Sequence, residues 1–146
     1  MLKQSEITEL LLLSSKNDTL SGIIKWYYET GELKYEAIYR NNKENGLSKT
    51  YYKSGELEAE ENYKGGKRDG FTKIYSKLGI LLSKRLYKNG EENGKARLYY
   101  ESGELECILN FKNGNVIAGL FYRKNGTVLK KMTYEDLCCI GLGEME

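Results

Sequence analysis

Histidine and proline are both absent from this chain of 146 residues. Without histidine the chain lacks the commonest general base and the commonest metal ligand, and it cannot form a Ser–His or Cys–His catalytic pair. Without proline, its turns must be built from other turn-forming residues such as glycine and asparagine. We therefore expect a protein that is not an enzyme and that needs no metal or other cofactor.

Cysteine is scarce, with only Cys107, Cys138 and Cys139 in the chain. An odd number with two adjacent residues is poor material for a disulfide framework and fits a reducing compartment. A catalytic cysteine needs an activating partner such as histidine, which is missing here. Cys138 and Cys139 are either a reactive pair or part of a tail, residues 135–146, that covers the last strand of the fold.

Long hydrophobic runs are missing as well. The run Leu10–Leu13 is too short for the core of a signal peptide or for a membrane span. This favours a cytoplasmic location, with an exported form whose signal has been removed as the alternative. The same leucines predict either a terminal strand or part of a short helix that begins near Ser5. Residues 1–21 are thus expected to be a half-unit or a capping strand, because a repeat array needs something to cover its edge.

Neither sign of charge dominates, since 23 basic residues face 21 acidic residues spread along the chain. A nucleic-acid-binding protein usually concentrates its cations on one face, so nucleic acid is an unlikely partner. Tyrosine is abundant, with 13 residues against 3 Phe and 1 Trp. Tyrosine suits a half-buried surface, because its ring packs while its hydroxyl reaches water or a partner.

A repeat of 24 residues accounts for most of the chain. Four full units run over residues 22–45, 46–69, 70–93 and 94–117, and a shortened fifth unit ends near Tyr134. Four columns keep their residue type in every unit: Gly31, Gly55, Gly79, Gly103 and Gly126; Tyr27, Tyr51, Tyr75, Tyr99 and Tyr122; Leu33, Leu57, Leu81, Leu105 and Val128; and Tyr39, Tyr63, Tyr87, Phe111 and Tyr134. We interpret these columns as the structural spine of the repeat.

Each unit reads as two strands and two turns. In the first unit a strand over residues 23–28 meets a three-residue loop that ends in Gly31, and a second strand covers residues 33–40. An Asn/Gly pair such as Asn41-Asn42 then leads into the next unit. The predicted fold is all-β: about five antiparallel hairpins over residues 22–134, forming an elongated, twisted meander sheet.

Pairing across the loop sorts the side chains onto two faces. We expect Tyr27 opposite Leu33, Lys25 opposite Tyr35 and Ile23 opposite Ala37, because strand residues alternate between faces. On this register the Tyr27, Leu33 and Tyr39 columns share one face. The other face is expected to be variable and mostly solvated, and in the first unit it carries Trp26, Tyr28, Glu32, Lys34 and Glu36.

Several features are candidate binding residues. The tyrosine columns form either a packing spine or a ladder that binds extended peptides. A cationic row, predicted to share the spine's face, either contacts an anionic membrane or an acidic partner or simply lays its stems over the tyrosine rings: Lys25, Lys49, Lys73 and Arg97. Further candidates for partner contact lie on the variable face: Trp26, Tyr28, Tyr52 and Tyr100.

Two other features have a structural and a functional reading. Carboxylates recur at the hairpin loops, where they are either solvated turn residues or ligands for acid–base chemistry or Ca²⁺: Glu29, Glu32, Glu56, Glu101 and Glu104. The two edges of the sheet, if uncovered, are sites for strand addition by a partner or by a second copy.

The repeat resembles the variant MORN repeat, as found in bacterial YwqK-type antitoxin components of toxin–antitoxin systems. The resemblance rests on Tyr-Tyr, Gly and Leu at fixed spacing over residues 22–134: Tyr27-Tyr28, Gly31 and Leu33; Tyr51-Tyr52, Gly55 and Leu57; Tyr99-Tyr100, Gly103 and Leu105. It departs at Ser76 in the third unit and at Gly119 in the fifth. The resemblance implies hairpin repeats, a protein-interaction or membrane-associated role, and a toxin as one possible partner.

Overall fold

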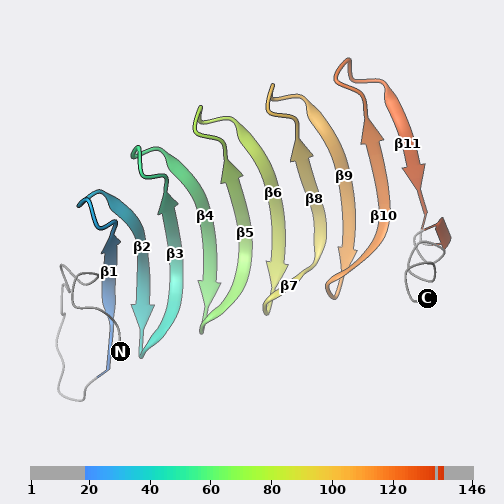
Figure 1. The fold of residues 1–146 in the computed structure, drawn as a ribbon. Coiled ribbons are helices and arrows are strands. Elements are labelled where there is room, and N and C mark those ends of the chain that lie inside the picture. The colour runs from blue at the N-terminus through green and yellow to red at the C-terminus, as the bar shows by residue number, and fades with distance from the viewer. Residues whose placement is uncertain (1–18, 134, 137–146) are drawn as a thin grey trace, which may run out of the picture.

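The computed structural model describes residues 19–133 and 135–136. These residues form one 11-stranded antiparallel sheet whose main strands lie side by side in chain order, from β1 at one end to β11 at the other (Figure 1). The strands are β1 (Gly22–Tyr27), β2 (Leu33–Arg40), β3 (Lys43–Tyr51), β4 (Leu57–Lys64), β5 (Lys67–Tyr75), β6 (Leu81–Lys88), β7 (Glu91–Glu92), β8 (Gly94–Tyr99), β9 (Leu105–Lys112), β10 (Asn115–Tyr122) and β11 (Val128–Met132). The predicted all-β meander of tandem hairpins is confirmed.

The turns have the predicted chemistry. In the first hairpin the Gly31 amide donates to the Tyr28 carbonyl and the Tyr28 amide donates to the Glu32 carbonyl, which closes a three-residue loop. Gly31 has a φ of 99°, in the left-handed region that the loop requires. Between hairpins, both residues of the Asn41-Asn42 pair have positive φ, as two-residue turns of this kind need.

The register inside each hairpin differs from the prediction. Tyr27 does pair with Leu33, but Trp26 pairs with Tyr35 and Lys25 pairs with Glu36. The extra residue opposite this step is Lys34, which forms a β-bulge next to the loop. The predicted pairs Lys25–Tyr35 and Ile23–Ala37 are therefore wrong by one residue.

A shift of one residue moves side chains to the other face of a strand. The Tyr27 and Leu33 columns lie on the same face as Lys25, but the Tyr39 column lies on the opposite face. Trp26 lies on that opposite face too, with its ring centroid 6.1 Å from the Tyr39 ring. The predicted spine of three columns on one face is thus divided between both faces. Tyr134 lies outside the described residues.

We call the face that carries Tyr39 the packed face, because the buried residues of the sheet lie on it. Its central side chains are mostly small, and the rings, arginines and glutamates around them shield them from water: Ile24, Ala37, Ser48, Thr72, Ser83, Ala96, Cys107, Phe111 and Met132. Ion pairs brace this surface at Arg68–Glu61 (2.7 Å) and Arg85–Glu92 (2.6 Å). Within residues 19–133 and 135–136, the sheet therefore has a thin core on its packed face.

The opposite face, which carries Lys25, we call the lysine face. A second bulge, at the start of the second and third units, brings the chain close to this face. In the second unit a Cβ on Gly46 would lie 3.0 Å from Cδ1 of Ile38, and Gly46 has a φ of 142°. Only glycine fits such a position without strain. The step into the fifth unit uses a smaller register shift, which explains why that unit is one residue shorter.

The ends of the array are described only in part. Leu20 and Ser21 hold the Asn41-Asn42 turn through their main-chain carbonyl and side-chain oxygens, at 2.9 and 3.0 Å. Glu44 and Asn45 hold the next turn in the same way. Leu20 and Ser21 therefore contact the first connecting turn as Glu44 and Asn45 contact the second, and the expected half-unit or capping strand over residues 1–21 stays a prediction. Leu10–Leu13 and Cys138-Cys139 lie outside the described residues, and within those residues no helix is long and apolar enough to cross a bilayer.

Candidate functional site

A row of directly paired residues crosses the lysine face from one end of the sheet to the other. Its members come from ten successive strands: Lys25, Glu36, Lys49, Glu60, Lys73, Lys84, Arg97, Ile108, Leu120 and Lys131. The predicted cationic row is part of it, and its four members share the face of the Tyr27 column as expected. The residues between them were not predicted to lie there.

In the N-terminal half of the row, cations and carboxylates alternate. The Lys49 ammonium lies 3.9 Å from the Glu36 carboxylate, and the Lys73 ammonium lies 3.0 Å from that of Glu60. Opposite charges on neighbouring strands attract each other directly. The hydrogen bond from Lys73 lowers the pKa of Glu60 and raises that of Lys73. These cations are therefore largely compensated by the sheet itself.

The tyrosine column beside the row also serves these carboxylates. The Tyr51 hydroxyl donates to Glu36 at 2.8 Å, and the Tyr75 hydroxyl donates to Glu60 at 3.3 Å. Partial burial, together with the bond to Glu36, raises the pKa of Tyr51 to about 12. Tyr51 and Tyr75 therefore hold these carboxylates in place through hydrogen bonds.

In the C-terminal half the alternation stops. Lys73 faces Lys84, and Lys84 faces Arg97, so three cations follow one another on β5, β6 and β8. Ile108 and Leu120 follow, so no carboxylate opposes Arg97 from the next strand. Among the described residues, neither Lys84 nor Arg97 has a carboxylate within 4.0 Å. The middle of the row, from Lys73 to Arg97, is therefore a concentrated positive site.

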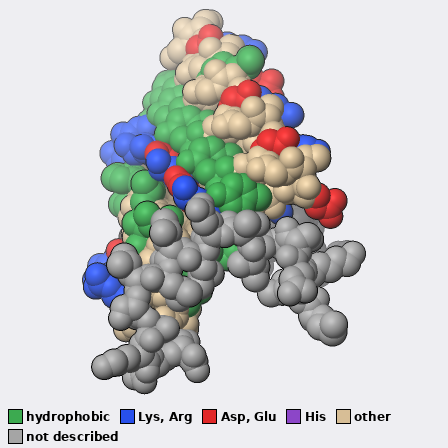
Figure 2. Space-filling model, turned by 90° about the vertical axis from the view of Figure 1, so that its left-hand side faces the viewer, with side chains coloured by type: hydrophobic (Ala, Val, Ile, Leu, Met, Phe, Trp, Pro, Cys, Tyr) green, Lys and Arg blue, Asp and Glu red, His purple; other side chains and the backbone are tan. Residues whose placement is uncertain are grey.

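Apolar side chains lie exposed beside the charged row. Phe71 is 44% exposed, and the Lys84 ammonium lies 4.4 Å from the centroid of its ring. Nearer the β1 end, Ile23 and Ile38 pair directly, and together with Leu47 they line an open hollow of about 180 Å³. Seen from the β1 end, a band of hydrophobic side chains runs up the molecule with charged side chains along its margins (Figure 2). Exposed apolar surface of this kind suits contact with another protein.

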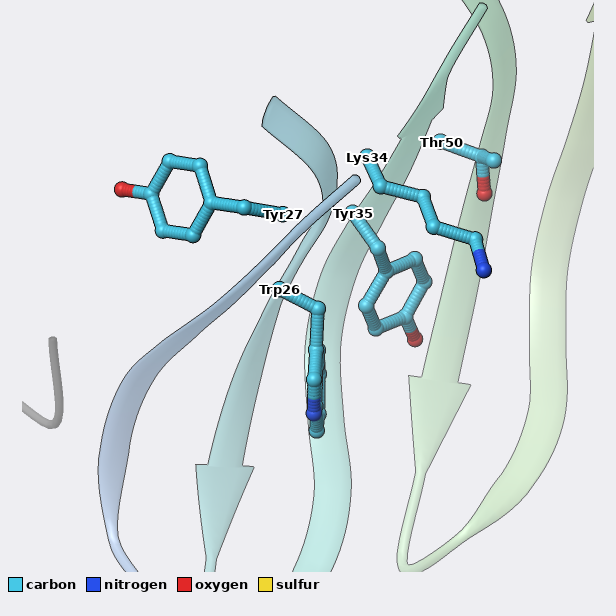
Figure 3. A pocket seen from close by; sticks show the side chains of 5 residues that line it. All are labelled: Trp26, Tyr27, Lys34, Tyr35 and Thr50. Atoms are coloured by element: carbon cyan, nitrogen blue, oxygen red, sulfur yellow. The ribbon is translucent and has the colours of Figure 1, made fainter. Parts of the chain in front are cut away.

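An open pocket of about 320 Å³ lies at the first hairpins, lined by Trp26, Tyr27, Lys34, Tyr35 and Thr50. The rings of Trp26 and Tyr35 lie side by side with centroids 5.1 Å apart, whereas Tyr27 points away from them (Figure 3). The hollow arises because Thr50, which pairs with Tyr35 on the next strand, has a much smaller side chain than the two rings. Trp26 thus lies in a concave part of the packed face, so the prediction that its face is mostly solvated is wrong.

The second tyrosine of each Tyr-Tyr pair links one hairpin to the next. The hydroxyl of Tyr28 donates to the carbonyl of Tyr51, that of Tyr52 to Tyr75, and that of Tyr100 to Tyr122, each at 2.8 Å. A lysine lies over each of these rings, at 5.5 to 5.7 Å from the centroid. This structural role was not predicted, although the recurrence of the pair in three units was a signal for it. In the third unit Ser76 accepts hydrogen bonds from its own loop instead.

The other candidates keep structural roles where they are described. The loop carboxylates Glu32, Glu56 and Glu104 are exposed, and hydrogen bonds from the Thr or Ser two residues earlier lower their pKa values. Over residues 19–133 and 135–136, no three Asp, Glu or Cys side chains gather as a metal site would require. Cys107 is buried on the packed face, and burial raises the pKa of its thiol.

Comparison with known proteins agrees with this geometry. The family model described as the MORN repeat variant matches residues 20–41, 44–64 and 92–113, which correspond to the hairpins β1–β2, β3–β4 and β8–β9. No curated protein matches the chain. Repeats of this type are generally modules for interaction with proteins or membranes rather than enzymes. The three matches show that the chain is similar to MORN-repeat proteins over these three hairpins.

Proposed function

We propose that the chain is a non-enzymatic module that binds another protein through the lysine face of its sheet. The observation that carries this proposal is that one column of residues on that face is constant while the row beside it varies. Tyr51 and Tyr75 hold neighbouring strands together through their hydrogen bonds to carboxylates. The adjacent row changes from unit to unit and lies beside the exposed side chains of Phe71, Ile23 and Ile38. Repeat proteins combine constant structural residues with variable surface residues, and they bind partners through the extended surface that the repeats form.

The antitoxin role implied by the resemblance is a narrower form of this proposal, in which the bound protein is a toxin. Its test is co-expression of the chain with each protein encoded next to its gene, followed by size-exclusion chromatography. A stable complex is expected with one of them. Failure of every neighbour to co-elute would remove the antitoxin form and leave general protein binding to be tested by the face-specific variants below.

Any complex obtained in this way can be assigned to a face by two variants. Phe71→Glu places a carboxylate in the middle of the exposed apolar and cationic surface and is expected to abolish co-elution. Leu78→Glu is the matched control, since Leu78 is 85% exposed in the loop between β5 and β6. Equal loss of the complex in both variants, or in neither, would contradict binding through the lysine face.

Membrane-surface association through Lys25, Lys49, Lys73 and Arg97 is the second candidate. Arg97 and its neighbour Lys84 favour it, because no carboxylate in the described chain neutralises them. The first three cations of the row weaken it, because Glu36 and Glu60 lie between them. Sedimentation with vesicles rich in phosphatidylserine tests it: binding that is unchanged by high salt would exclude this electrostatic mechanism.

A further inference from the structure

The middle of the row holds an arrangement of charges that lowers the stability of the fold. Lys73, Lys84 and Arg97 are direct cross-strand neighbours. Like charges directly opposite each other destabilise a sheet. The first two units have a carboxylate where the third has Lys84, namely Glu36 and Glu60. The later units have no carboxylate at this position, but only in the third unit does a cation stand there between two other cations.

Local contacts within the described chain compensate this charge only in part. Lys73 has Glu60 at 3.0 Å, and Lys84 has the face of the Phe71 ring at 4.4 Å. Arg97 faces Ile108 on its other side. All three residues are only half-buried, so their charged groups remain accessible to a ligand. An anionic ligand would relieve the repulsion that the sheet leaves in place.

We propose that Lys73, Lys84 and Arg97 form a binding site for an acidic segment of a partner protein. This inference rests on the proposed function and names the chemistry of the segment that the lysine face recognises. Neighbouring strands lie about 4.8 Å apart, so the three cations span about 10 Å. That span matches two or three carboxylates of one short acidic stretch. Phe71 and Leu86, which pair with each other beside the cations, supply an apolar contact for the same segment.

The surroundings of the site favour a short segment over an extended anionic surface. On the N-terminal side the row continues with the carboxylates of Glu60 and Glu36, which repel anions. On the C-terminal side it continues with the uncharged Ile108 and Leu120. A flat anionic membrane laid on this face would also meet the two glutamates. A short acidic segment can contact the three cations alone.

The test uses the full chain and a fluorescently labelled hepta-glutamate peptide, with binding followed by fluorescence anisotropy at low and high salt. We expect salt-sensitive binding that Lys84→Glu weakens by about tenfold or more, because the change removes one attraction and adds one repulsion. The matched control is Lys43→Glu, which makes the same change in net charge at an exposed lysine that also faces a cation, Arg40. It is expected to change the affinity by less than about threefold.

Three results would overturn the inference. The first is no peptide binding at low salt, and the second is an equal effect of the two variants. The third is binding of phosphatidylserine vesicles in the absence of peptide binding, which would assign the cations to a lipid surface. A protein partner whose complex survives Lys84→Glu but not Phe71→Glu would leave the proposed function standing while this inference fails.

Discussion

The second hairpin, β3–β4, and the third hairpin, β5–β6, have the same length and the same turns but differ in two contacts. The second hairpin carries Tyr52, whose hydroxyl bonds to the next hairpin and which we call the staple, and the carboxylate Glu60. The third hairpin has Ser76 and Lys84 in the corresponding places. Both keep the glycine of the loop and the Tyr–Leu pair beside it. The frame of the repeat is therefore separable from the staple and from the charged row.

The family comparison divides the hairpins in the same way. The variant MORN repeat matches the second hairpin but not the third. The third hairpin nevertheless pairs with both neighbours in the continuous sheet. Loss of a staple and of an alternating charge thus leaves the fold intact and produces the one stretch of uninterrupted cations on the row. We infer that the third hairpin is locally less stable than the second because it keeps adjacent cations on its surface.

The largest expected effect comes from giving the second hairpin the charge of the third. Glu60→Lys removes the ion pair with Lys73 and the hydrogen bond from Tyr75, and it places a third cation between Lys49 and Lys73. Because the pair is partly exposed, we expect a loss of about 1 to 2 kcal/mol in the free energy of unfolding. Urea denaturation measures it. A loss below about 0.3 kcal/mol would show that the alternating row does not stabilise the sheet.

A smaller effect is expected from the staple. Tyr52→Phe removes only the hydroxyl that donates to the Tyr75 carbonyl and is expected to lower the free energy of unfolding by about 1 kcal/mol. The reverse change, Ser76→Tyr, should supply the missing staple of the third hairpin and raise the free energy by about 0.5 kcal/mol. Thermal denaturation of both variants checks the pair. A gain from removing the Tyr52 hydroxyl would contradict the role given to it.

The smallest effect concerns acid. The folded protein lowers the pKa of Glu60 from its ordinary value of 4.5 through the bond from Lys73. A carboxyl whose pKa is lowered by folding contributes stability above pH 4.5, and this contribution disappears as the pH falls through the lowered pKa. The difference in unfolding free energy between the native chain and Glu60→Gln should therefore be full at neutral pH and shrink below pH 4.5. A difference that grows on acidification would reverse the assigned sign.

The repeat columns made most of the fold predictable. Gly31 and its counterparts mark the loops, the Asn/Gly pairs mark the connections, and the strands lie between them as expected. The faces were predicted less well, because the Lys34 bulge leaves no mark in the sequence of a single unit. An insertion of one residue opposite a strand reverses every later side chain. The Tyr39 column therefore had to be seen in the structure before it could be placed.

The candidate site was predictable in part. The lysine column and its face followed from the spacing of Lys25, Lys49, Lys73 and Arg97. The position of Lys84 in the row could not be predicted, because it depends on the β-bulge next to the hairpin loop. The hydrogen bonds of Tyr28, Tyr52 and Tyr100 join different units, so no pattern within one unit specifies their acceptors. Because the acceptors are main-chain carbonyls, the types of the side chains do not indicate them.

The unfolding free energy of Lys84→Glu tests the central claim most directly. This change gives the third hairpin the alternating charge of the second, with a carboxylate between Lys73 and Arg97. If the native cations are kept for binding at the expense of the fold, the variant should be more stable than the native chain by about 0.5 to 1 kcal/mol, with the gain reduced at high salt. A variant that is less stable would show that Lys84 serves the fold, and would contradict the account.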